Sequence, residues 1–231
     1  MAKLITVKGA AGRADAPRII RTPGVAGYAS RFIAGHIDSP IGAVVTRWEP
    51  VAGDNPQAMV ALAGTTSTVT LQEEAGSKYL RSPGNALGGG RLISPNIAQR
   101  PVTMAAVIRT PVSVERSVGI TGSFITRNAN GSYQGTSGSS AAYTLENRSG
   151  WIVVILAQAA DNSFVVRAGA YEAQSAAGSA VPATYSGMYF GASEAGDVAD
   201  IKELIYWDKQ LDLAERNAVH GYLLSRYPNA V

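Results

Sequence analysis

The segment that decides the fold is residues 196–227, which read GDVADIKELIYWDKQLDLAERNAVHGYLLSRY. Its first half, Ala199 to Trp207, is largely apolar and contains isoleucine, tyrosine and tryptophan, a composition that predicts a strand. Asp212 follows, and Glu215 stands three residues later, which is the capping-box pattern that begins a helix. The segment therefore predicts a strand followed directly by a capped helix.

The predicted helix is short and amphipathic. Its stripe of side chains at helical spacing consists of Val219, Tyr222, Leu223 and Arg226, with Ala218 beside it. Pro228 cannot continue a helix, so the helix is expected to end near Tyr227. A helix of this kind lies with its stripe against a sheet.

This segment resembles the closing motif of the concanavalin A-like lectin and laminin-G-like jelly rolls, versions of which occur in bacterial and phage proteins. The positions that carry the resemblance are Ile201, Glu203, Ile205, Tyr206, Leu211, Glu215, Arg216, Val219, Tyr222, Leu223 and Tyr227. Upstream, Trp151 opens an apolar strand and residues 187–191 form a short one, in the order that this superfamily has. The resemblance implies an all-β, two-sheet antiparallel jelly-roll sandwich with a short C-terminal α-helix, of the kind found in phage virion proteins.

The rest of the chain alternates short strand-like runs with turn-forming residues. The predicted strands are residues 41–48, 58–63, 67–71, 103–109, 119–127, 151–157, 163–167 and 187–191. Two glycine-rich stretches, 84–90 and 131–142, are expected to be surface loops. This pattern agrees with a sandwich and predicts one domain, residues 38–231.

Residues 1–37 are expected to form an extended basic arm, because glycines and prolines interrupt every apolar run there. Against one acidic residue, Asp15, the arm holds Lys3, Lys8, Arg13, Arg18, Arg21 and Arg31, a net charge of +5. These six side chains are predicted to anchor the protein to a neighbouring subunit. Nucleic acid is not expected as a partner, because no aromatic residues interleave with the charges.

Composition excludes several kinds of chemistry. The chain has no cysteine, which rules out disulfides and thiolate zinc sites, and its two histidines, His36 and His220, are isolated from one another. The first residues lack the apolar core of a signal peptide, and the longest apolar run, residues 151–157, is far too short to span a bilayer. We therefore expect no cofactor, no metal and no membrane partner, and a protein made in the host cytoplasm.

Glu203 invites a catalytic interpretation because it lies within an otherwise apolar strand. Sandwich glycosidases of the superfamily carry two closely spaced carboxylates on one strand. On a regular strand, the residues that share a face with Glu203 are Ala199, Ile201, Ile205 and Trp207, and none is acidic. Glu203 is therefore predicted to be structural, bonded to backbone or paired with an arginine, and no catalytic residue is predicted.

Two loops carry oxygen-rich pairs, Asp54–Asn55 and Asp161–Asn162, which could hold calcium or a sugar hydroxyl or simply form turns. Trp48, Tyr133 and Tyr143 stand in or near loops, where they could stack on a sugar or belong to the core. The candidate glycan contacts are Trp48, Asp54, Asn55, Tyr133, Asp161 and Asn162.

The resemblance and the arm together predict a non-enzymatic structural protein of a phage or phage-derived particle, such as a capsid decoration or a tail or fibre component. Its partners would be other virion subunits and further copies of itself, and its location the virion. The alternative is a glycan-binding module that recognises host-surface polysaccharide. A glycoside hydrolase is a third interpretation, and it lacks the acidic pair.

Overall fold

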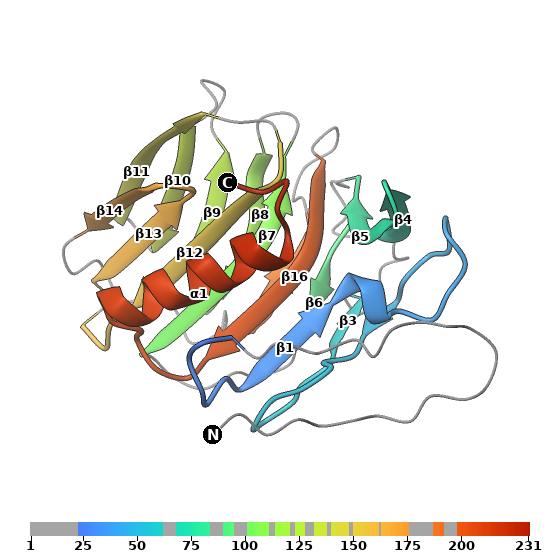
Figure 1. The fold of residues 1–231 in the computed structure, drawn as a ribbon, viewed down its shortest axis with the longest axis horizontal. Helices are drawn as coiled ribbons and strands as arrows, with labels where there is room; N and C mark the ends of the chain where they lie inside the picture. Colours follow the sequence, from blue (N-terminus) through green and yellow to red (C-terminus); the bar gives the residue numbers. More distant parts are fainter. Residues whose placement is uncertain are drawn as a thin grey trace.

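The structure, a computed structural model of the chain, describes residues 23–61, 68–83, 90–94, 101–110, 114–120, 123–127, 132–137, 140–147, 150–161, 163–175, 187–191 and 198–231. Within them, two antiparallel sheets pack face to face as a sandwich, and one α-helix lies across the outside of one sheet (Figure 1). The predicted fold class, an all-β two-sheet sandwich with a C-terminal helix, is confirmed. The first five residues of the predicted anchoring set, Lys3 to Arg21, lie outside the described residues.

The sheet under the helix, called here the helix-covered sheet, has the strand order β14–β13–β12–β7–β16–β5–β4, and β1 also pairs with β16. Its strands are β1 (Ser30–Ile33), β4 (Thr70–Glu74), β5 (Ser77–Ser82), β7 (Val102–Arg109), β12 (Ile152–Gln158), β13 (Phe164–Ala168), β14 (Tyr171–Ser175) and β16 (Ala199–Trp207). The second sheet has the order β11–β10–β9–β8–β15–β6–β3–β2. Its strands are β2 (Arg47–Trp48), β3 (Met59–Ala61), β6 (Leu92–Ile93), β8 (Val114–Ile120), β9 (Ser123–Arg127), β10 (Ser132–Ser137), β11 (Ser140–Asn147) and β15 (Met188–Phe190).

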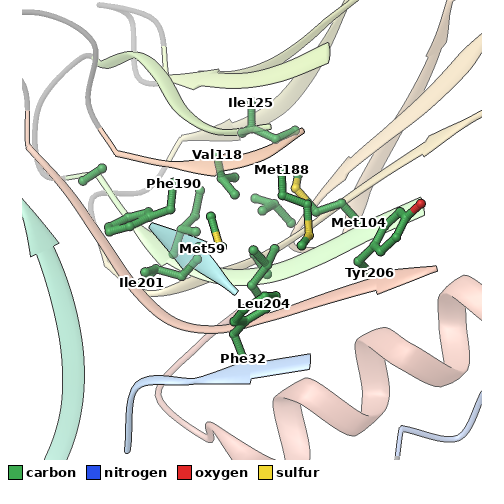
Figure 2. Packing of buried hydrophobic residues seen from close by; sticks show 14 of the residues in the cluster. Phe32, Met59, Met104, Val118, Ile125, Met188, Phe190, Ile201, Leu204 and Tyr206 are labelled. Carbon is green, nitrogen blue, oxygen red and sulfur yellow. The ribbon is translucent and has the colours of Figure 1, made fainter. Parts of the chain in front are cut away.

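The main core lies between the two sheets. Met104 and Leu204 of the helix-covered sheet meet Met59, Val118 and Met188 of the second sheet (Figure 2), and all five are fully buried. Alternate side chains of a strand enter this layer, for example Met104, Ala106 and Ile108 of β7, as the two-residue period of a strand requires. The core thus has the form that the alternating sequence pattern predicts.

A second apolar layer lies between the helix-covered sheet and α1 (Leu213–Arg226). The capping box is present, because the Glu215 backbone N–H donates to Asp212 Oδ1 at 2.8 Å and the Asp212 N–H donates to Glu215 Oε2 at 3.0 Å. Val219 and Leu223 of the predicted stripe are fully buried. The helix ends at Arg226, two residues before Pro228, as predicted.

Strand β16 contains a β-bulge at Lys202. Ile201 pairs with Ile108 and Glu203 pairs with the preceding residue of β7, Val107, so that Lys202 is left over. Ala199 and Ile201 point into the sandwich before the bulge, and Leu204 and Tyr206 do so after it. Glu203 consequently faces the helix side together with Asp200, Ile205 and Trp207.

The bulge overturns one prediction. We expected Glu203 to share a face with Ala199 and Ile201, which a regular strand would require, and both lie on the opposite face. The acidic residue Asp200 shares the face instead. The expected presence of Ile205 and Trp207 beside Glu203 is correct, because the alternation is regular again after the bulge.

Part of the predicted arm, residues 1–37, belongs to the sandwich. Ser30–Ile33 form β1, which pairs with residues 203–206 of β16 and is buried along its whole length. Residues 30–33 therefore belong to the sandwich. The expected loop at residues 131–142 is also wrong in part, because residues 132–137 and 140–147 form the strands β10 and β11.

The environment of His220 predicts a pH-dependent stability. This side chain of α1 is 9% exposed, and burial together with the nearby Arg167 guanidinium lowers its pKa from 6.5 to about 4. In the unfolded chain the His220 side chain binds a proton near pH 6.5, whereas in the folded chain it does so only near pH 4. Its contribution to the free energy of unfolding is therefore complete above pH 6.5 and is lost as the pH falls from 6.5 toward 4.

We expect the free energy of unfolding of the parent protein to fall by about 2 kcal/mol between pH 7 and pH 5 because of this one group. In a His220→Gln variant that part of the pH dependence is expected to disappear, whatever the absolute stability of the variant. Urea unfolding at both pH values measures the two differences. Equal losses in parent and variant would contradict the assignment to His220.

Candidate functional site

Two of the predicted glycan contacts are core residues. Trp48 is 1% exposed and packs between Phe32 and Phe190, with ring centroids 5.2 and 6.5 Å away. Tyr133 is fully buried, and its hydroxyl lies 3.0 Å from Thr110 Oγ1. Their prediction as sugar-stacking residues is wrong, because both side chains point between the sheets.

Asp161 makes a turn. Its Oδ1 accepts from the backbone N–H of Ser163 at 2.9 Å and from its hydroxyl at 2.6 Å, and these bonds lower the pKa of the exposed carboxyl. Asp161 thus forms a turn, which is one of the two roles predicted for the oxygen-rich pairs. Asn162 and the side chain of Tyr143 lie outside the described residues.

Asp54 and Asn55 are exposed in a loop that is held against the segment before β1. The Asp54 N–H donates to the Tyr28 carbonyl at 3.1 Å, and the Asn55 N–H donates to the Ala29 carbonyl at 3.0 Å. Gly53 makes this approach possible: its φ is +149°, and a Cβ there would lie 2.1 Å from the Ala29 oxygen. The loop and the segment thus form one edge of the sandwich, joined by backbone hydrogen bonds.

A pocket of about 260 Å³ opens at this edge and is lined by Pro23, Ala26, Gly27, Tyr28, Gly53 and Asp54. Tyr28 is half-buried, and its ring meets Trp207 edge-on at a centroid distance of 6.5 Å. Within the described part of the chain, the exposed Asp54 carboxylate accepts no hydrogen bond. We call this feature the Tyr28–Asp54 pocket.

The pocket combines two kinds of side chain that bind sugars, a carboxylate and an aromatic ring. A carboxylate accepts hydrogen bonds from hydroxyl groups, and a tyrosine ring offers an apolar face with a polar tip. Gly27, at φ +73°, leaves the space next to Asp54 Oδ2 open. Asp54 was predicted from the sequence as an oxygen-rich loop residue, whereas Tyr28 falls within the predicted arm and was not; an aromatic residue directly after Gly27 was the available signal.

Glu203 is structural, as predicted, and its partners explain why. Its fully buried carboxylate pairs with Arg31 Nε at 2.9 Å and Arg226 Nε at 2.8 Å, and the Tyr227 hydroxyl donates to it at 2.8 Å. Burial, followed by the Glu203 charge, raises the pKa of the neighbouring Tyr222 to about 12. Arg31 is fully buried in this pair, so its predicted role in a surface anchor is wrong.

Asp200, on the same face, is held in a similar way. It accepts two bonds from Arg81, at 2.8 and 2.9 Å, and two from Arg109, at 2.9 and 2.7 Å. Both buried carboxylates of β16 are therefore committed to pairs of arginines. No set of three His, Asp or Glu side chains that could hold a metal ion occurs in the described ranges.

The helix of the described structure is too short and too polar to cross a membrane, and no other described helix is long enough to do so.

No protein-family model and no curated protein matches the sequence. Solved structures do match. A Trypanosoma rangeli sialidase has a TM-score of 0.60 and 16% identity, over 88% of this chain and 34% of the sialidase. The binding domain of botulinum neurotoxin serotype D/C has a TM-score of 0.52 and 12% identity, over 85% and 52%. The receptor-binding domain of botulinum neurotoxin type G has a TM-score of 0.50 and 9% identity, over 87% and 52%.

This chain thus spans about a third of the sialidase and about half of the neurotoxin chains. At such identities the likeness shows the fold alone, an antiparallel two-sheet β-sandwich. A sandwich of this kind is what the resemblance of residues 196–227 implies. The connection with phage proteins gains no support from these structures.

Proposed function

We propose that this concanavalin A-like sandwich is a non-enzymatic binding module that recognises a glycan in the Tyr28–Asp54 pocket. The observation that carries the proposal is the presence, in one pocket, of a half-buried tyrosine ring and an exposed carboxylate. Two of the similar structures are described as a binding domain and a receptor-binding domain, which supports a role in recognition.

The chemistry of the pocket indicates the kind of sugar. A volume of about 260 Å³ suits one sugar ring at the end of a chain. The Asp54 carboxylate can accept bonds from two neighbouring hydroxyl groups while the sugar ring lies against Tyr28. A carboxylate repels an acidic ligand, so the pocket favours neutral or amino sugars.

A glycan array with the intact protein is expected to show binding to neutral or amino-sugar glycans. The Asp54→Asn and Tyr28→Ala variants are each expected to weaken binding of the best array ligand by about tenfold or more, since hydrogen bonds to charged groups contribute about 1.5–3 kcal/mol. Isothermal titration with that ligand measures the change.

Asp161→Asn is the control, because Asp161 is also an exposed aspartate and lies in another turn. It is expected to bind as the parent does. If all three variants bind equally well, or if the array shows no neutral glycan, the assignment to this pocket fails.

The virion location stays a prediction, and its test is copurification with particles. A deletion that probes the basic arm should end before residue 23, because Ser30–Ile33 complete the helix-covered sheet and Val25 packs under α1. A deletion of residues 1–37 would remove β1 and the Arg31–Glu203 pair. It would therefore test folding rather than anchoring.

A further inference from the structure

Cations and aromatic rings alternate in a row on the outer face of the helix-covered sheet, beside the C-terminal end of α1. In order, the row consists of Arg226, Tyr227, Lys202, Trp151, Arg109, Tyr79 and Arg81. Each cation lies 4.2–5.7 Å from the centroid of the next ring. The members come from α1 and its end, β16, the start of β12, β7 and β5, elements that lie side by side in Figure 1. We call this feature the cation–aromatic row.

The charges of the row are unevenly compensated. Asp200 pairs with Arg81 and Arg109, and Glu203 pairs with Arg226. Among the residues that the structure describes, Lys202 has no carboxylate within ion-pair distance; its ammonium lies 4.2 Å from the centre of the Trp151 ring and 5.7 Å from that of Tyr227. The middle of the row therefore keeps a positive charge without a direct partner.

One carboxylate that is not part of the cation–aromatic row, that of Glu74, contacts the middle of the row. Glu74 lies at the turn between β4 and β5, and its Oε2 accepts from Arg109 Nη1 at 2.6 Å and from Trp151 Nε1 at 3.2 Å. Its side chain is 51% exposed. The Trp151 bond and the charges of Arg109 and Lys202 lower the pKa of Glu74. A half-exposed carboxylate thus occupies a position that two donors and a nearby lysine define.

We infer that the Glu74 position is a binding site for the carboxylate of an acidic sugar, a uronic acid. The ligand carboxylate takes the place of Glu74 and accepts from Arg109 and Trp151, with Lys202 as the additional positive charge. Trp151 and Tyr79 are 7% and 5% exposed, so their faces are covered and cannot stack on bases. Single-stranded nucleic acid needs exposed aromatic faces beside the charges and is therefore the less suitable ligand, whereas a saccharide that carries a carboxylate needs only the charges and the donors. This site is separate from the Tyr28–Asp54 pocket and does not depend on it.

Glu74→Gln tests the inference, because it removes the resident negative charge from an exposed turn and keeps the shape of the side chain. Tetragalacturonic acid is the probe, and its neutral methyl ester is the ligand control. The variant is expected to bind the acid about fivefold more tightly than the parent in titrations at low ionic strength. Neither protein is expected to bind the ester through this site.

Glu73→Gln is the matched control, because it changes the net charge equally at the neighbouring exposed position and leaves Arg109 and Trp151 untouched. It is expected to bind the acid as the parent does. Lys202→Met is expected to weaken binding of the acid at least fivefold, with its melting temperature measured in parallel to verify folding.

Equal affinities in the Glu74 and Glu73 variants, or no binding of the acid by either the parent or the Glu74 variant, would overturn the inference. Asp54→Asn separates the two proposals: it is expected to keep its affinity for tetragalacturonic acid while losing the array ligand. Loss of both ligands in that variant would contradict the independence of the two sites.

Discussion

The Glu203→Gln variant is expected to have a free energy of unfolding about 3–5 kcal/mol below that of the parent protein, because one partner of a fully buried ion pair is removed. Glutamine keeps the shape of the side chain, but it removes the negative charge of Glu203 from the fully buried guanidinium of Arg31. Arg226, on the other carboxylate oxygen, also loses its ion-pair partner. Urea unfolding at pH 7, followed by tryptophan fluorescence, measures the loss.

Glu49→Gln provides the control for this experiment. Glu49 pairs with Arg47, and both side chains are more than half exposed, at 62% and 59%. The loss expected there is below about 1 kcal/mol. If the two variants lose the same amount, the Arg31–Glu203 pair contributes no more than a surface pair, and the structural role assigned to Glu203 is wrong.

The Asp200→Asn variant is expected to lose about 3 kcal/mol of stability. The buried Asp200 carboxylate holds two arginines from neighbouring strands through four hydrogen bonds of 2.7–2.9 Å. Without its charge, Arg81 and Arg109 repel one another across β16. Because the Arg81 side chain is 38% exposed, salt is expected to screen part of this repulsion, so the loss should shrink at high ionic strength.

Glu74→Gln removes a carboxylate from the same arginine at an exposed position. Its expected cost is about 1 kcal/mol or less. The comparison separates burial from charge, since Asp200 and Glu74 both bond to Arg109 and differ in exposure, 0% against 51%. A larger loss for Glu74→Gln than for Asp200→Asn would contradict the account of the row given above.

The fold was predictable from the sequence where local patterns determine it. The capping box at Asp212 and the two apolar runs of the β12–β13 hairpin are signals that a few neighbouring residues carry. Strand β10 and the start of β11 escaped prediction because they lie within residues 131–142, a stretch rich in glycine and serine, and these residues ordinarily indicate loops. At Gly135 a side chain would collide with Val166, whose Cβ would lie 2.8 Å from the added Cβ, so there the residue choice reflects packing between sheets.

The candidate site was less predictable, because it depends on contacts between distant segments. Asp54 was identified as an oxygen-rich loop residue, but its companion Tyr28 lies in a segment that no local pattern assigns to the sandwich. Arg31 looked like one more charge of the arm. Its burial depends on Glu203, a residue 172 positions later in the chain. Trp48 and Tyr133 were predicted as glycan contacts but are buried between the sheets. The sequence does not distinguish the two cases, since an aromatic residue near a turn can point to either side of a sheet.

The extra residue at Lys202 also bears on how this chain can change in length. Removing Lys202 itself would leave a regular strand, in which Ile201 and Leu204 still point into the sandwich and Glu203 still faces the helix. Removing Ile205 instead would shift the end of the strand by one position, so that Trp207 would enter the sandwich and Tyr206 would meet the helix. We therefore expect deletion of Ile205 to abolish folding, while deletion of Lys202 and a single-residue deletion at the exposed Asp161 are tolerated. A library of one-residue deletions, scored for soluble expression, would show the difference directly.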